Sequence, residues 1–326
     1  MGDGAGIPLG RSVIDRAAHH RGDPAWLTAA WARGRVVVVD TAAGVTLVDA
    51  AGALVLRDPA GVSLDAAEAL LDAAAADPAL VDPAARGAYF LGVDGDGTPY
   101  FAVDAPLAAG PGQRLAGLRD LADRLPARDA DLLVTALGVA HWHARHGHSA
   151  ATGSPTRVRD GGWTRVDAAG AQSWPRTDPA VIMLVHDGGP GPGGRCLLAV
   201  NASWDDAAVK RFSCLAGFVE PGESAESAVA REVAEEVGVP VGPITYVGSQ
   251  PWPYPSSLML GFLALADPAV PVREDPAEIA LARWFTRAEV AAIRAGEERR
   301  LPGGARIAVT SNASISASLI DHWLAS

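Results

Sequence analysis

One segment of 23 residues, 217–239, constrains the fold of this chain more than any other. It reads GFVEPGESAESAVAREVAEEVGV and begins with a glycine-containing turn. Ser224 follows the turn at a position suited to cap a helix. Apolar residues then recur at every fourth position from Ala225 to Val237, which predicts a helix with one buried face. The segment therefore predicts a loop followed by an amphipathic helix that packs on a core.

Three glutamates on this predicted helix are three and four residues apart, so their carboxylates share one face. Repulsion at this spacing costs a few tenths of a kcal/mol per pair, and the single lysine of the chain, Lys210, lies outside the helix. Mg²⁺ prefers carboxylate oxygens and often shares them with substrate phosphates. A solvated acidic face is the alternative, but this cluster adjoins the apolar stripe, so we favour a divalent-cation site. The residues are Glu232, Glu235 and Glu236.

The spacing of the segment matches the Nudix box, G-x5-E-x7-R-E-U-x-E-E-x-G-U, where U is a bulky apolar residue. The specified positions are filled by Gly217, Glu223, Arg231, Glu232, Val233, Glu235, Glu236, Gly238 and Val239. The chain thus resembles the Nudix hydrolases. The resemblance implies an α+β fold in which a mixed sheet lies between helices and the box forms a loop–helix–loop.

A second motif, SQPWPYPSSLM at residues 249–259, resembles the SQPWPFPxSLM signature of the NADH pyrophosphatase family. Tyr254 replaces the usual Phe and retains an aromatic ring that can stack on a nucleotide. Three prolines in five residues predict an irregular, rigid loop, for which a proline-braced surface turn is the alternative. The expected substrate-binding residues here are Gln250, Pro251, Trp252, Pro253, Tyr254, Pro255, Ser256 and Ser257.

The resemblance to this family extends from about residue 85 to the C-terminus, and residues 174–183 are like the start of the family's catalytic domain. It implies that the Ala216 carbonyl and Glu278 contribute to a metal site. It also implies that Phe218 faces the nicotinamide. Ser316 stands where family members have a substrate-contacting alanine.

The chain departs from the family at the zinc ribbon that usually joins the two domains. The ribbon's cysteine positions align with residues that cannot act as thiolates, so we expect no structural zinc. The two cysteines of the chain, Cys196 and Cys214, lie in apolar contexts typical of buried, inert thiols. The positions aligned with the ribbon are Ser149, Thr152, Val166 or Asp167, and Ala169.

Four of the eight histidines lie within residues 141–148. His143 and His146 are three residues apart, so a metal site on one helix face is conceivable. The alternative is the polar end of a helix that runs into a loop, and we favour that interpretation.

These signals divide the chain into three parts. Residues 1–125 form a smaller α+β domain without a catalytic motif, residues 126–177 form a helix and a degenerate ribbon connector, and residues 178–326 form the Nudix domain. The expected elements are strands over 35–40, 44–48, 180–185 and 196–200, a hairpin over 89–103, a short helix over 63–72, and a helical pattern over 113–146 broken near Pro126.

The overall charge of the chain restricts the kinds of molecule it is expected to bind. A formal net charge of −11 argues against general nucleic-acid binding and against docking on anionic lipid. No signal peptide and no apolar segment of about 18 residues is evident. We therefore expect a cytoplasmic protein with no membrane contact.

The resemblance implies hydrolysis of the pyrophosphate bond of NADH or NAD⁺ to AMP and nicotinamide mononucleotide by a homodimer. Two or more Mg²⁺ or Mn²⁺ ions would orient the diphosphate and lower the pKa of the attacking water. Glu235 is the preferred base for that water, and Arg231 is expected to brace the loop through Glu223.

Two alternatives remain open. The first is a Nudix hydrolase that prefers ADP-ribose or NAD-capped RNA, for which a local arginine patch would be needed. The second is a catalytically silent Nudix domain that senses NAD metabolites.

Overall fold

The computed structural model describes residues 6–62, 87–204 and 206–326, and it divides into two compact units. The N-terminal unit comprises Arg11–Thr177 together with Pro251–Ser256. The C-terminal unit comprises Asp178–Gln250, Ser257–Ser326 and the described part of Met1–Gly10. A short stretch of the predicted substrate-binding loop thus clusters with the N-terminal unit.

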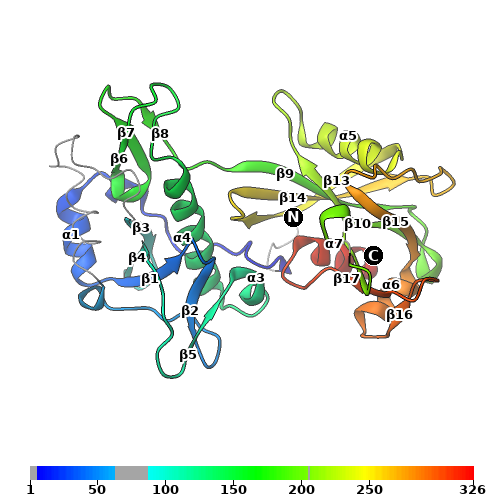
Figure 1. The fold of residues 1–326 in the computed structure, drawn as a ribbon, viewed down its shortest axis with the longest axis horizontal. Helices are drawn as coiled ribbons and strands as arrows, with labels where there is room; N and C mark the ends of the chain where they lie inside the picture. Colours follow the sequence, from blue (N-terminus) through cyan, green and yellow to red (C-terminus); the bar gives the residue numbers. More distant parts are fainter. Residues whose placement is uncertain (1–5, 63–86, 205) are drawn as a thin grey trace. The chain divides into compact units, whose positions relative to one another are not determined.

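A five-stranded sheet forms the centre of the N-terminal unit, with the order β3-β4-β1-β2-β5 (Figure 1). Strands β1 and β4 are parallel, and the other neighbours are antiparallel. The strands and the hairpin predicted in this region are confirmed. The bounds are β1 Arg35–Asp40, β2 Val45–Asp49, β3 Ala88–Val93, β4 Pro99–Asp104 and β5 Gln113–Ala116.

The predicted helical pattern over 113–146 is wrong at its start. Gln113–Ala116 is the edge strand β5, because its backbone pairs with β2. The rest of the pattern forms α3, Leu118–Leu121, and the 19-residue helix α4, Ala127–Arg145, which begins directly after Pro126 as predicted. Helix α1, Pro24–Ala32, packs near β4. The helix predicted over 63–72 lies outside the described residues.

The connector after α4 contains a small three-stranded antiparallel sheet that the sequence did not predict. Two turns of this connector hold residues aligned with the lost zinc ribbon. Thr152 Oγ1 donates to Asp167 Oδ2 at 2.6 Å, and the Ala169 amide donates to Asp167 Oδ1 at 3.0 Å. The hydrogen bond between Thr152 and Asp167 thus joins the two turns. The strands are β6 Thr156–Arg159, β7 Thr164–Asp167 and β8 Gln172–Ser173.

The histidines near the end of α4 make internal contacts. The His143 side chain is buried, lies 2.8 Å from the Gly162 carbonyl oxygen through Nε2, accepts from Arg165 through Nδ1 and stacks on Tyr89. Burial lowers the pKa of His143 to about 3, so the ring is neutral. These contacts support a packing role for His143.

The main sheet of the C-terminal unit has six strands in the order β13-β14-β9-β10-β15, with β12 paired to β9 (Figure 1). It is mixed, because β14 is parallel to β9 whereas β10 and β12 are antiparallel to it. The expected strands over 180–185 and 196–200 are confirmed as part of β9 and β10. The bounds are β9 Asp178–His186, β10 Arg195–Asn201, β12 Leu215–Phe218, β13 Val241–Trp252, β14 Ser257–Ala266 and β15 Ile279–Thr286.

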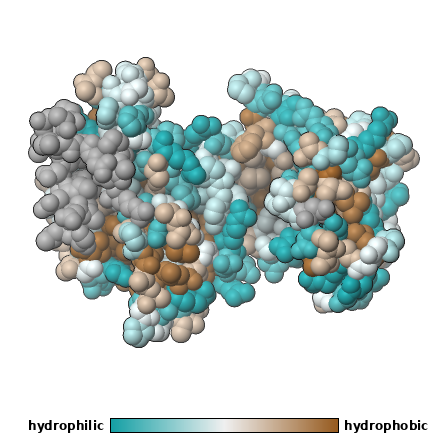
Figure 2. Space-filling model, viewed as in Figure 1, coloured by the Kyte–Doolittle hydropathy of each residue, from teal (hydrophilic) through white to brown (hydrophobic). Residues whose placement is uncertain are grey.

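Each face of this sheet has its own core. Along β9, Ile182 and Leu184 face one core, and Val181, Met183 and Val185 face the other, as the alternation of a strand requires. Helix α5, Ala225–Val237, covers the second core, and the surface over it is largely hydrophilic (Figure 2). The first core is covered by α6 Arg287–Arg294, α7 Ile315–Ala325 and a second sheet of β11 Val209–Phe212, β16 Arg299–Arg300 and β17 Arg306–Val309.

Both cysteines are buried free thiols, as predicted. Burial raises the pKa of Cys196, and it raises that of Cys214 to about 12. Among the helices of the described residues, none has the length and hydropathy of a membrane span.

A buried carboxylate near the start of α4 organises the N-terminal segment. Asp131 Oδ2 accepts from the backbone amides of Val13 and Ile14, each at 2.9 Å, and from Ser12 Oγ, while Oδ1 pairs with Arg16. The side chain is 4% exposed. Removing this acceptor leaves the buried Ile14 amide and three part-buried donors without their partner, which is costly.

We predict that Asp131→Ala lowers the free energy of unfolding by about 3 kcal/mol, because buried donors lose a charged acceptor. Urea denaturation followed by circular dichroism measures this change. The matched control, Asp96→Ala in an exposed turn, should change stability by less than about 0.5 kcal/mol. Equal stability of the two variants would contradict the prediction.

Candidate active site

The predicted loop and helix form as the sequence indicates. The Ser224 Oγ accepts the Ser227 amide at 3.1 Å, which caps the first turn of α5. The helix ends at Gly238, whose φ of 69° lies in the left-handed region that favours glycine. Val229, Val233 and Val237 are buried in the core beneath the sheet. The polar side of the helix therefore faces away from that core.

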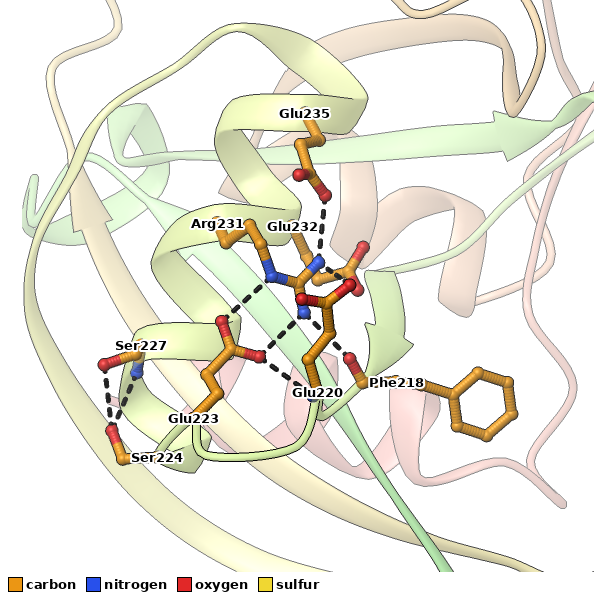
Figure 3. A network of polar contacts seen from close by, with 8 residues as sticks. All are labelled: Phe218, Glu220, Glu223, Ser224, Ser227, Arg231, Glu232 and Glu235. Carbon is orange, nitrogen blue, oxygen red and sulfur yellow. Dashed lines mark hydrogen bonds and ion pairs between the residues drawn. The ribbon is translucent and has the colours of Figure 1, made fainter.

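Arg231 uses all five of its N–H donors to connect the loop with the helix (Figure 3). It binds both carboxylate oxygens of Glu223 at 2.8 and 2.9 Å, and it donates to the Phe218 carbonyl at 2.8 Å. It also contacts the carboxylates of Glu232 at 2.8 Å and Glu235 at 2.9 Å. The structure thus has the expected Glu223 pair and adds three partners that the sequence analysis did not predict.

The charges of this network stabilise each other. Hydrogen bonds from Arg231 lower the pKa of Glu223, and the same bonds, which Glu223 accepts, are the largest cause of the raised pKa of Arg231. Burial raises the pKa of Glu232 and outweighs the opposing effect of Arg231. The repulsion expected between carboxylates on the helix is therefore offset by an arginine of the same helix.

Glu236 differs from its neighbour Glu235, although both belong to the predicted acidic face. Glu235 has a side chain that is 58% exposed, whereas Glu236 is buried, at 4% exposure. The Glu236 Oε2 is buried and has no hydrogen-bond partner. Burial, followed by the negative charges of Glu232 and Glu278, raises the pKa of Glu236 to about 8, against the effect of a backbone hydrogen bond from Ala216.

Gly217 allows the Glu232 carboxylate to lie against the backbone. A Cβ added at Gly217 would lie only 1.9–2.2 Å from the three carboxyl atoms of Glu232, which is far inside van der Waals contact. Glycine is therefore required at the first position of the motif if the Glu232 carboxylate is to lie this close to the backbone.

The donor set fits a divalent cation that also contacts its substrate. Glu236 has a buried carboxylate oxygen without a hydrogen-bond partner, and the negative charges of Glu232 and Glu278 act on it. Over residues 6–62, 87–204 and 206–326, no three His, Cys, Asp or Glu side chains converge closely enough to enclose a metal ion. Mg²⁺ is commonly held by one or two carboxylates and substrate phosphates, and this arrangement suits that mode.

Two residues expected to bind substrate are instead packed inside the C-terminal unit. The Gln250 amide donates to the carbonyls of Pro8 and Ala313 and accepts from the Ile315 amide, and its side chain is 1% exposed. Ser316 is fully buried and accepts from the Cys214 amide at 3.0 Å. The hydrogen bonds of both side chains support the surrounding backbone.

The other expected binding residues lie at accessible positions or on the loop. Phe218 is 59% exposed, and its ring points away from the Arg231 network (Figure 3). The rings of Trp252 and Tyr254 are 5.2 Å apart on the loop that clusters with the N-terminal unit. Strand β13, which leads into this loop, is an edge strand, as its prolines require. The remaining loop positions are Pro251, Pro253, Pro255 and Ser256, and Ser257 begins β14.

Comparisons with known proteins match both parts of the chain. A family model described as "NUDIX domain" matches residues 176–302, and one described as "NADH pyrophosphatase-like rudimentary NUDIX domain" matches residues 32–142. These matches confirm the expected α+β architecture, in which a Nudix fold follows a smaller N-terminal domain.

Curated relatives cover most of the chain. The NAD-capped RNA hydrolase NudC of Mycobacterium bovis (strain BCG / Pasteur 1173P2) is 40% identical over 251 residues, which are 76% of this chain and 78% of that protein. The NAD-capped RNA hydrolase NUDT12 of Homo sapiens is 37% identical over 62% of this chain and 43% of that protein. A solved NUDIX hydrolase from Nitrosomonas europaea is 24% identical, with a TM-score of 0.32 over 46% of this chain and 90% of that chain.

We predict that Gly217→Ala leaves the fold intact but weakens Mn²⁺ binding by at least about tenfold. The new methyl group displaces a flexible carboxylate, Glu232, which costs little folding energy but moves a predicted ligand. Mn²⁺ titration by electron paramagnetic resonance measures the affinity. The control Gly242→Ala adds a methyl in ordinary contact, 3.7 Å from the Leu265 carbonyl, and should bind Mn²⁺ normally. Normal binding by Gly217→Ala would refute the prediction.

The raised pKa of Glu236 predicts how the stability of the metal-free protein depends on pH. The folded protein keeps this proton up to about pH 8, whereas the unfolded chain releases it near pH 4.5. The free energy of unfolding should therefore fall as the pH rises from about 4.5 to 8, by on the order of 4 kcal/mol relative to Glu236→Gln. Urea denaturation in EDTA across this range tests it, and parallel pH profiles for the two proteins would contradict it.

Proposed function

This chain belongs to the NADH pyrophosphatase family of Nudix hydrolases, and we propose that it hydrolyses the pyrophosphate bond of NADH or NAD⁺. The products would be AMP and nicotinamide mononucleotide. The observation that carries the proposal is the unpaired, buried oxygen of Glu236 beside two further carboxylates, because a diphosphate needs a bound cation to offset its charge.

The proposed metal ligands are four glutamates and one backbone carbonyl, shared among two or more Mg²⁺ or Mn²⁺ ions, so that each ion would be held by one or two carboxylates together with substrate phosphates. The bound ions would supply charge for the diphosphate and acidify the attacking water. Arg231 holds the carboxylates of Glu232 and Glu235 in place from the loop side. Burial keeps Glu236 away from solvent. The ligands are Glu232, Glu235, Glu236, Glu278 and Ala216.

Glu235 is the proposed general base. Its carboxylate is 58% exposed, so water can reach it, and it pairs with Arg231 at 2.9 Å. A carboxylate within hydrogen-bond reach of the attacking water can take a proton as the new bond to phosphorus forms. The buried Glu236, whose pKa is raised, is less suited to this role at neutral pH.

On the substrate side, we propose that the exposed ring of Phe218 stacks on the nicotinamide and that the loop rings of Trp252 and Tyr254 contribute to nucleotide binding. Aromatic rings bind flat heterocycles by offset stacking. The prolines of the loop restrict its backbone, so less conformational entropy is lost when it binds a ligand.

NAD-capped RNA is the second candidate substrate, because the curated relatives are named as hydrolases of it. The bond cleaved in the cap is the same pyrophosphate bond. The formal net charge of −11 disfavours a long RNA footprint, so binding of capped RNA would have to rely on the cap and the nucleotides next to it.

We predict that the purified protein converts NADH or NAD⁺ to AMP in the presence of Mg²⁺ or Mn²⁺. Glu236→Gln should lower kcat at least about 100-fold, because it removes a proposed metal ligand. Product chromatography measures the turnover, with ADP-ribose and NAD-capped RNA as parallel substrates. Glu226→Gln, an exposed residue of the same helix, is the matched control and should keep normal activity.

The products distinguish the alternatives. Faster release of nicotinamide mononucleotide from capped RNA than from free NAD⁺ would favour the second candidate. Absence of AMP from the free dinucleotides and from ADP-ribose, together with absence of nicotinamide mononucleotide from capped RNA, would overturn the enzymatic proposal and leave the silent metabolite sensor, which would still bind the dinucleotide. Normal turnover by Glu236→Gln would overturn the assigned metal ligands.

A further inference from the structure

The loop Pro251–Ser256 has an unusual position in the fold. Along the sequence it comprises the last two residues of β13 and the turn into β14 of the C-terminal unit, yet its residues cluster with the N-terminal unit. The residues that flank it, Gln250 and Ser257, belong to the C-terminal unit. Contacts within the N-terminal unit therefore determine the conformation of the loop itself.

Arg119 of α3 spans both aromatic rings of the loop. Its guanidinium carbon lies 4.5 Å from the ring centroid of Tyr254 and 5.2 Å from that of Trp252. The planar, permanently charged guanidinium is suited to stack on two rings at once. Arg119 also forms hydrogen bonds that act on the Tyr254 hydroxyl, the group that distinguishes this chain from relatives with Phe.

His141 of α4 supports the loop backbone. Its Nδ1 lies 2.9 Å from the carbonyl oxygen of Pro253, and a further backbone contact involves Pro255. Because a carbonyl can only accept, Nδ1 carries the proton. One turn earlier, Gly138 brings the helix close to the loop, since a Cβ placed there would lie 4.0 Å from the Cβ of Pro253.

We propose that Arg119 and His141 are positioning residues through which the NADH pyrophosphatase-like domain holds Pro251–Ser256 in its substrate-binding conformation. The inference rests on the proposed function, because it takes the loop as part of the substrate site. Both residues lie within the match to that domain, residues 32–142. The N-terminal domain, which has no catalytic motif of its own, thereby acquires a role in the reaction.

The first test observes the loop without reference to activity. Protein labelled with 5-fluorotryptophan gives fluorine resonances, and Trp252→Phe identifies the one from Trp252. We expect Arg119→Ala and His141→Ala to shift or broaden this resonance. His141→Asn should restore it in part, because its amide can donate in place of Nδ1.

The control Arg124→Ala removes a neighbouring arginine whose side chain is 75% exposed, and it should leave the Trp252 resonance unchanged. An unchanged resonance in both Arg119→Ala and His141→Ala would overturn the proposal. This readout does not depend on hydrolysis, so it separates failure of the positioning role from failure of the proposed function.

The second test uses the hydrolysis of NADH. Arg119→Ala should raise KM about tenfold and change kcat less than twofold, because the loop binds substrate and the carboxylates remain in place. Arg119→Lys should restore only part of the affinity, since an ammonium lacks the planar face. A loss of kcat at constant KM would overturn the proposal.

A double-mutant cycle shows whether Arg119 acts through the loop rings. If it does, Arg119→Ala should add little to the rise in KM caused by Tyr254→Leu, so the two effects are not additive. Full additivity would overturn the proposal. If the unmodified protein hydrolyses no dinucleotide, the proposed function fails and the substrate-binding part of this inference fails with it, while the fluorine spectra still decide whether the two residues hold the loop.

Discussion

The five hydrogen bonds of the Arg231 guanidinium are the interaction on which the site depends. They join a loop carbonyl, a loop carboxylate and two helix carboxylates through one rigid, planar group. A lysine has three donors around a point charge and lacks this fork. Because the charge of Arg231 lies among the carboxylates, the helix can carry three glutamates on one side without the full cost of their repulsion.

Burial then gives different properties to residues of the same type. Glu235 and Glu236 are adjacent in the sequence, but one helical step of about 100° separates an exposed carboxylate from a buried one. The buried carboxylate keeps an unpaired oxygen, which is costly for an isolated folded chain and favourable where a cation binds. Gly217 contributes to the same arrangement, because its lack of a side chain leaves room for the carboxylate of Glu232.

Local features of the site could be predicted from the sequence, and non-local ones could not. The Ser224 cap, the buried valines and the Glu223–Arg231 pair depend on residues within one turn and one helix. The spacing of four between Arg231 and Glu235 also indicated their contact, and it was overlooked. Gln113–Ala116 became a strand because it pairs with β2, about 65 residues earlier, and the packing of Gln250 depends on residues near both ends of the chain. No local pattern contains that information.

The composition of the loop Pro251–Ser256 explains why a second domain contributes to it. Pro251, Pro253 and Pro255 have no N–H group, so the loop cannot satisfy its carbonyls as a hairpin would. A donor must come from elsewhere, and His141 supplies one to Pro253. The aromatic rings between these prolines also need a fixed neighbour, and Arg119 provides it. A proline-rich loop and a domain that holds it therefore satisfy a single physical requirement, which is a rigid loop conformation with its polar groups paired.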